Sequence, residues 1–153
     1  MANSYSQISI QFVFAVKYRN TVILENWEID LYKYITGIVQ NKNHKMIAIN
    51  GMPDHIHILV GLNTVQSIAD LMRDVKANSS KWINENNITP EKFEWQTGYG
   101  AFSYSKSHVQ RVVNYIKNQK QHHQKQTFLE KYKTYLEKFE IEYNKDFKFN
   151  ELI

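Results

Sequence analysis

Two alternating runs on either side of a short turn constrain the fold of this chain more than any other feature. Residues 45–51 and 55–61 both have the period-two pattern of β-strands, and Pro53 lies in the turn between them. This arrangement predicts a β-hairpin, in which the two strands are antiparallel neighbours. Because successive side chains point to opposite faces of a strand, the second run has one imidazole-bearing face and one apolar face. The imidazole-bearing face contains His55, His57 and Leu59, and the apolar face contains Ile56, Ile58 and Val60.

The two histidines on one strand face form a candidate metal site. Their side chains are expected about 7 Å apart along the strand, from which both rings can lean toward one ion. Two ligands do not complete a metal site, however, and a bare His-x-His pair also occurs on solvated strand faces. A third ligand is therefore needed before the pair indicates chemistry.

A candidate third ligand lies in a predicted helix over residues 107–124. The apolar residues of this segment fall at helical spacing, at Val109, Val112, Val113 and Ile116. Tyr115 and Gln119 are four residues apart, so a continuous helix would place them on one face. Such a pair is ordinary on its own, because tyrosine is often half-buried and glutamine solvated. Its interest depends on the histidines.

Together these segments resemble the single-tyrosine HUH transposases of small bacterial insertion sequences, the IS200-like family, which includes the transposases associated with repetitive extragenic palindromes. The His–hydrophobic–His motif of that family is similar to His55-Ile56-His57, and its Tyr-x-x-x-Gln motif is similar to the segment from Tyr115 to Gln119. The opening strand and residues 96–103 also resemble the family. The likeness runs from about residue 8 to about residue 145.

The resemblance implies a metal-dependent DNA transposase that cleaves and rejoins single-stranded DNA at insertion-sequence ends. Tyr115 is then the nucleophile, which forms a 5′-phosphotyrosine intermediate and leaves a free 3′-OH. His55, His57 and Gln119 are then the ligands of a divalent metal, Mg²⁺ or Mn²⁺, which neutralises charge on the phosphoryl oxygens. Two imidazoles and an amide oxygen suit Mn²⁺ better than Mg²⁺. No other cofactor is implied.

The resemblance also implies partners. Members of the family are homodimers that bind single-stranded DNA beside small hairpins. In some of them the tyrosine and glutamine of one subunit complete the histidine pair of the other, and this sequence is compatible with either arrangement. Phe147 and Phe149 are expected to pack on a partner subunit. His122, near the Tyr115 face of the predicted helix, is a further candidate for contact with metal or phosphate.

Four basic residues are candidates for contacts with DNA phosphates. Lys17 and Arg19 end the opening strand, and Arg73 and Lys76 lie in a predicted helix over residues 65–86, a region that helps to bind a DNA hairpin in the family. A net charge of +4, a pI near 9.1 and an aromatic content of 14% are compatible with binding unpaired nucleic acid. Most lysines of this kind are simply solvated, so charge alone does not establish DNA binding.

The order of elements predicts an α+β fold. Further strands are expected at residues 7–17 and 98–104, and further helices at residues 25–42 and 127–140. The first six elements follow the ferredoxin-like split βαβ pattern, which is an antiparallel sheet with helices on one face. Extra C-terminal helices follow it. Residues 1–153 are expected to form one domain, and the resembling family has this fold too.

Composition excludes several classes of protein. The absence of cysteine excludes disulfides and thiolate metal sites and favours a cytoplasmic location. The family resemblance implies that the host is a bacterium or archaeon. No apolar run approaches the roughly 20 residues of a membrane span.

Two other functions stay open. A non-catalytic nucleic-acid-binding module of the same fold would need neither Tyr115 nor Gln119. A zinc hydrolase would need a general base, for which the motif offers only Asp54, and an amide is an unusual zinc ligand. A domesticated relative that processes repeats would use the same chemistry as the transposase.

Overall fold

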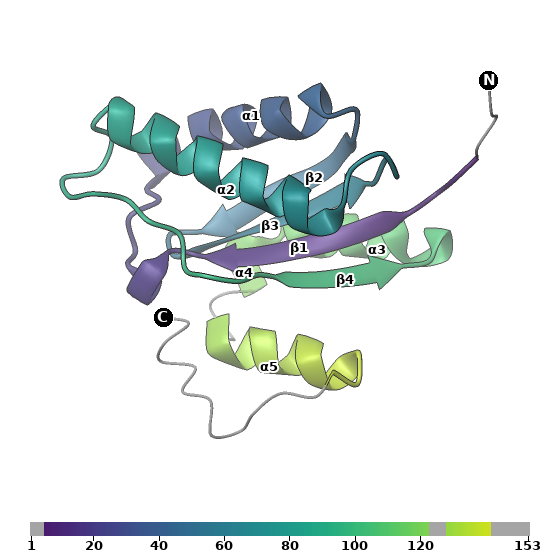
Figure 1. The fold of residues 1–153 in the computed structure, drawn as a ribbon. Coiled ribbons are helices and arrows are strands. Elements are labelled where there is room, and N and C mark those ends of the chain that lie inside the picture. Colours follow the sequence, from purple (N-terminus) through teal and green to yellow (C-terminus); the bar gives the residue numbers. More distant parts are fainter. Residues whose placement is uncertain (1–4, 123–127, 142–153) are drawn as a thin grey trace.

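The computed structural model describes residues 5–122 and 128–141 of the 153-residue chain. Four strands in this part form one antiparallel sheet with the order β2-β3-β1-β4 (Figure 1). The strands are β1 (Ser9–Ala15), β2 (Lys45–Met52), β3 (His55–Gly61) and β4 (Gly100–Tyr104). The helices are the short 3-10 helix η1 (Lys17–Arg19), α1 (Glu25–Asn41), α2 (Ile68–Glu85), α3 (Lys106–Lys117), α4 (Gln119–His122) and α5 (Phe128–Lys138).

The helices cover both faces of the sheet. Helices α1 and α2 lie on one face, and α3, α4 and α5 lie on the other (Figure 1). The split βαβ order and the antiparallel sheet of the α+β prediction are confirmed. The structure adds that the C-terminal helices pack on the face opposite α1 and α2. None of the described helices is long and apolar enough to span a bilayer.

Strand β1 lies between β3 and β4 and contributes to a hydrophobic core on each side of the sheet. Phe12 and Phe14 pack with residues of α1 and α2, and Val13 and Ala15 pack with residues of α5. This is the alternation that the sequence predicts for this strand. All seven residues of β1 are buried, including Gln11, which lies on the same face as Val13 and Ala15.

The hairpin of β2 and β3 positions the two histidines. His57 pairs with Asn50 across the hairpin and His55 pairs with Met52, and β1 pairs with the other edge of β3. Gly51 in β2 lies so close to β3 that a Cβ atom there would collide with the carbonyl oxygen of His55. A glycine is required at this point because the two backbones approach so closely.

The predicted tyrosine helix is interrupted. Helix α3 ends at Lys117, Asn118 adopts a non-helical conformation (φ −97°, ψ 20°), and α4 begins at Gln119. Tyr115 and Gln119 therefore do not share one continuous helix, contrary to the prediction. Asparagine favours helix ends because its side chain competes for backbone hydrogen bonds. The side chain of His122 and the tail residues Phe147 and Phe149 lie outside the described residues.

Candidate active site

The two histidines of β3 are completely buried. His55 and His57 are each 0% exposed, and their ring centroids are 5.2 Å apart with planes at 70°. The ring of Phe128, on α5, lies 4.8 Å from that of His55. The face that bears the imidazoles is thus covered by C-terminal helices, which excludes a solvated strand face for this pair.

A hydrogen-bond acceptor holds each imidazole at Nδ1. Oδ1 of Asp54 lies 2.7 Å from Nδ1 of His55, and Oε1 of Gln11 lies 2.8 Å from Nδ1 of His57. Because an acceptor at Nδ1 keeps the proton there, the Nε2 lone pair of each ring is left for another partner. Burial lowers the pKa of His57 well below its usual value, and the nearby His55 and Lys131 lower it further. His57 is therefore neutral at neutral pH, as a metal ligand must be.

The Nε2 atoms of the two histidines have different surroundings. Nε2 of His57 is buried and has no hydrogen-bond partner in the described part of the chain. Nε2 of His55 lies 3.2 Å from the ammonium nitrogen of Lys131, on α5. That same nitrogen donates a hydrogen bond of 2.5 Å to Oε1 of Gln119. The structure thus brings His55 and Gln119, from β3 and α4, onto one positively charged atom.

Gln119 and Lys131 are buried despite their polarity. Gln119 is 0% exposed, and its Nε2 donates to the carbonyl oxygen of Tyr115 at 3.3 Å, which orients Oε1 toward Lys131. Lys131 is 1% exposed, and burial lowers its pKa to about 8, an effect that the negative charge of Asp54 opposes. A buried ammonium needs acceptors, and Gln119 and His55 supply them.

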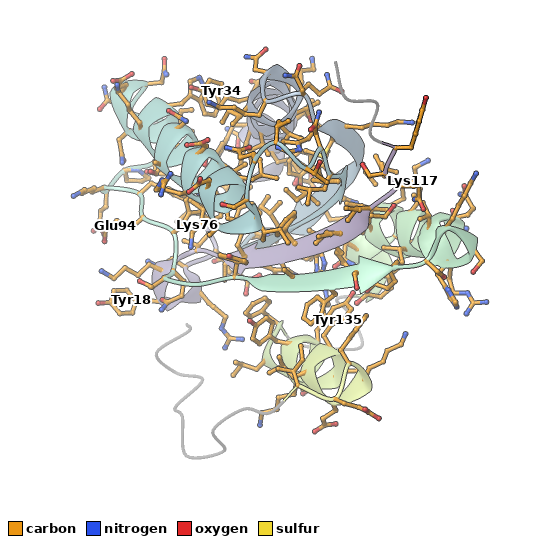
Figure 2. The ribbon with its side chains drawn as sticks, turned by 45° about the vertical axis from the view of Figure 1, so that its right-hand side comes forward. Tyr18, Tyr34, Lys76, Glu94, Lys117 and Tyr135 are labelled. Atoms are coloured by element: carbon orange, nitrogen blue, oxygen red, sulfur yellow. The ribbon has the colours of Figure 1, made fainter. Side chains whose placement is uncertain are left out.

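Tyr115 lies beside His57 in the same chain. It is half-buried on α3, and its ring centroid is 6.0 Å from that of His57 with planes at 80°. Its ring also meets that of Tyr135 edge-on at 6.2 Å. Figure 2 shows Tyr135 reaching from α5 toward the sheet. The proposed nucleophile and metal ligands therefore meet within one chain.

Comparison with known proteins identifies the family. Residues 4–119 match the sequence model of the family described as transposase, IS200 like. The chain belongs to this family. It is also 22% identical over 118 residues to the ISDra2 transposase TnpA of Deinococcus radiodurans, an alignment that covers 74% of this chain and 84% of the relative.

Two solved structures share the fold of this IS200-like transposase. One is a crystal structure from Deinococcus radiodurans R1, described as a candidate transposase, with a TM-score of 0.62 and 21% identity, covering 78% of this chain and 95% of that one. The other is a REP-associated tyrosine transposase bound to a REP hairpin, with a TM-score of 0.58 and 15% identity, covering 77% of this chain and 70% of that one.

The four basic residues predicted to bind DNA lie in different surroundings in this family member. Lys17 forms an ion pair with Glu94 at 3.1 Å, and the guanidinium of Arg19 lies 5.9 Å from the ring centroid of Phe128, at the edge of the histidine site. Arg73 and Lys76 lie on α2, which covers the face of the sheet opposite α3, α4 and α5 (Figure 1). These two residues do not belong to the Tyr115 site, and their role in hairpin binding stays a prediction.

Lys76 is half-buried and bonds to the backbone. Its ammonium group donates to the carbonyl oxygens of Gln96 and Gly98 at 2.6 and 2.8 Å. Burial lowers its pKa below the usual lysine value. Arg73 is exposed and pairs with Asp70 at 2.8 Å.

Three residues of the site were not predicted from the sequence. Gln11 and Asp54 hold the imidazoles, and Lys131 occupies the cation position. Each of these residues has only a weak signal in the sequence. Gln11 is a polar residue in the middle of an apolar strand, Asp54 directly precedes the first histidine, and Lys131 lies on the helix face that also carries Phe128 and Tyr135.

Proposed function

We propose that this chain is a DNA transposase that cleaves and rejoins single-stranded DNA through a covalent 5′-phosphotyrosine intermediate on Tyr115. Membership of the IS200-like family supports the reaction class. The observation that supports the site is the position of Tyr115 beside His57, whose buried Nε2 has no partner among the described residues. A binding module would need neither group.

The residues present fit a divalent metal ion. His55 and His57 offer imidazole nitrogens, Gln119 offers an amide oxygen, and His55 and Gln119 both contact the ammonium of Lys131, which supports a site for a cation. We infer that His55, His57 and Gln119 hold Mn²⁺ or Mg²⁺, which would neutralise charge on the scissile phosphate. Nitrogen donors favour Mn²⁺ over Mg²⁺. Asp54 and Gln11 fix the orientation of the two rings, as outer partners of ligating histidines do.

A tyrosine nucleophile keeps the energy of the broken phosphodiester bond, because the phosphate stays covalently attached to the protein. The phenolic oxygen of Tyr115 forms a bond to phosphorus while the bond from phosphorus to the 3′ oxygen breaks. The phenolic proton is lost and the leaving oxygen gains a proton, which yields a free 3′-OH. Attack by a 3′-OH on the phosphotyrosine reverses these changes and rejoins DNA without any further cofactor.

The proposed partners follow the family. We propose single-stranded DNA with hairpin ends as substrate, supported by the fold shared with a transposase bound to a REP hairpin. We also propose a homodimer. The contact between Tyr115 and His57 within one chain supports an active site completed by a single subunit.

The zinc hydrolase alternative has less support. The carboxylate of Asp54, the candidate general base, is already engaged with Nδ1 of His55 at 2.7 Å. Residues 5–122 and 128–141 contain no group of three His, Cys, Asp or Glu side chains that could hold a metal. A domesticated relative that processes repeats would use the same residues as the transposase.

The test is covalent capture of DNA. Purified protein is mixed with single-stranded oligonucleotides from either side of its own gene, with Mn²⁺ or Mg²⁺, and read on denaturing gels. We expect a protein–DNA adduct with the wild type, none with Tyr115→Phe or His57→Ala, and a normal adduct with Tyr34→Phe, a control on α1 (Figure 2). An adduct with Tyr115→Phe would refute the nucleophile. Hairpin binding without any adduct would support the binding module.

A further inference from the structure

A cavity of about 240 Å³ lies beside Tyr115, between α3 and α5. Tyr104, Tyr115 and Tyr135 line it. The amide of Gln11 fixes two of these rings, because its Nε2 donates to the hydroxyl of Tyr104 at 2.8 Å and its Oε1 accepts from the hydroxyl of Tyr135 at 3.2 Å. Tyr135 also stacks on Phe102 at a centroid distance of 4.9 Å. The cavity therefore has aromatic walls held in place at both ends.

The same cavity is bordered by positive charge. Arg111, Lys131 and Lys138 line it, and no aspartate or glutamate of the described residues does. His108, Arg111 and Tyr115 are spaced by three and four residues along α3, so they share one helix face.

Arg111 and Lys138 are both exposed. Neither pairs with a carboxylate in the part of the chain that the structure describes. Lys17, Arg73 and Lys120, in contrast, each have an acidic partner within 3.1 Å. Unpaired cations beside aromatic walls favour a ligand with an aromatic ring and negative charge.

We propose that this cavity holds one unpaired nucleotide of the substrate strand, next to the phosphate that Tyr115 attacks. The base stacks against Tyr104 and Tyr135, and the phosphate lies beside Arg111 and Lys138. This inference rests on the proposed function, because it takes the substrate as DNA. Aromatic faces bind unpaired bases whatever their sequence, and arginine suits phosphate oxygens. A base still paired in a duplex could not enter, so the cavity would itself select single strands at the cleavage position.

Binding can be tested without cleavage. The experiment uses the Tyr115→Phe protein and oligonucleotides that carry the fluorescent base 2-aminopurine at one position at a time. We expect strong quenching at one position only, since a stacked 2-aminopurine loses fluorescence. In wild-type adducts, that position should adjoin the phosphate joined to Tyr115. Adding Tyr135→Leu should remove the quenching and weaken binding roughly tenfold.

A second variant, which changes a charge at the surface, tests the proposal independently of any folding defect in the Tyr135→Leu protein. Arg111 is exposed, so Arg111→Gln should fold normally while weakening oligonucleotide binding roughly tenfold and reducing its salt dependence by about one phosphate contact. Lys33→Gln removes an equal charge from α1, on the other face of the sheet, and should leave binding unchanged.

The outcomes separate the inference from the proposed function. Covalent adducts without quenching at any position, or equal binding by the Arg111→Gln and Lys33→Gln proteins, would overturn the cavity assignment but not the proposed transposase function. Quenching that depends on Tyr135, without any adduct, would support the nucleotide site and contradict the proposed transposase function.

Discussion

The ammonium nitrogen of Lys131 lies 2.5 Å from Oε1 of Gln119, a distance that places a buried cation on a proposed metal ligand. The same nitrogen contacts Nε2 of His55. A metal ion bound to His55 and Gln119 would occupy the place of this ammonium, so the two cations exclude each other. Helix α5 therefore carries an internal competitor for the proposed metal.

Removing this competitor should strengthen metal binding. We expect Lys131→Met to bind Mn²⁺ at least roughly tenfold more tightly than the wild type, because about 1.4 kcal/mol of relieved competition gives that factor. Titration followed by the electron paramagnetic resonance of free Mn²⁺ measures it. Lys33→Met, on the exposed side of α1, is the control. Unchanged affinity in the Lys131→Met protein would show that the ammonium and the metal do not compete.

Gln11 should affect the metal without touching it. Gln11→Leu removes the acceptor at Nδ1 of His57, and loss of such outer partners typically weakens metal affinity roughly 10–100-fold. Gln11→Glu keeps an acceptor and should retain most of the affinity. The same Mn²⁺ titration applies, with circular dichroism to verify the fold. Equal affinity in the Leu and Glu variants would contradict the orienting role.

The active site should be complete within one chain. Tyr115 lies beside His57 of its own chain, so a mixture of Tyr115→Phe and His57→Ala subunits should form no covalent DNA adduct. A mixture of wild type with the doubly substituted protein is the positive control. Adduct formation in the first mixture would show that the tyrosine of one subunit acts with the histidines of the other.

Lys76 should matter for stability. Lys76→Met leaves the carbonyl oxygens of Gln96 and Gly98 without their donor, which should lower the free energy of unfolding by about 1–2 kcal/mol. Arg73→Met, on the exposed side of the same helix, should change it by less than about 0.5 kcal/mol. Urea unfolding followed by tryptophan fluorescence measures both. Equal stability of the two variants would mean that the Lys76 contacts contribute nothing measurable.

Local patterns in the sequence predicted most of the fold. The alternation of residues 55–61 matches β3 to the residue, and the apolar spacing after residue 25 matches α1 within one residue. The period of the apolar residues indicates which face of a helix or strand is buried. In a sheet covered on both faces, it therefore predicts which side chains enter each core. The break at Asn118 was missed because no proline or glycine marks it and asparagine also occurs inside helices.

The site was only partly accessible from the sequence. His55, His57, Tyr115 and Gln119 belong to motifs that a local pattern can contain. The position of Lys131 depends instead on how α5 packs across the sheet, which no local pattern encodes. Gln11 is also a tertiary feature, because its partners His57, Tyr104 and Tyr135 come from three other elements.

Strand β3 links the chemistry of this protein to its folding. Ile56, between the two histidines, is fully buried in the core formed with α1 and α2, while His55 and His57 face the site on the other side. A slip of one residue in the register of β3 would move both imidazoles into an apolar core and expel Ile56 and Ile58 from it. A misregistered sheet would thus lose both its stability and its imidazole cluster. A chain with this strand misaligned would therefore unfold, and would not remain as a stable protein without the site.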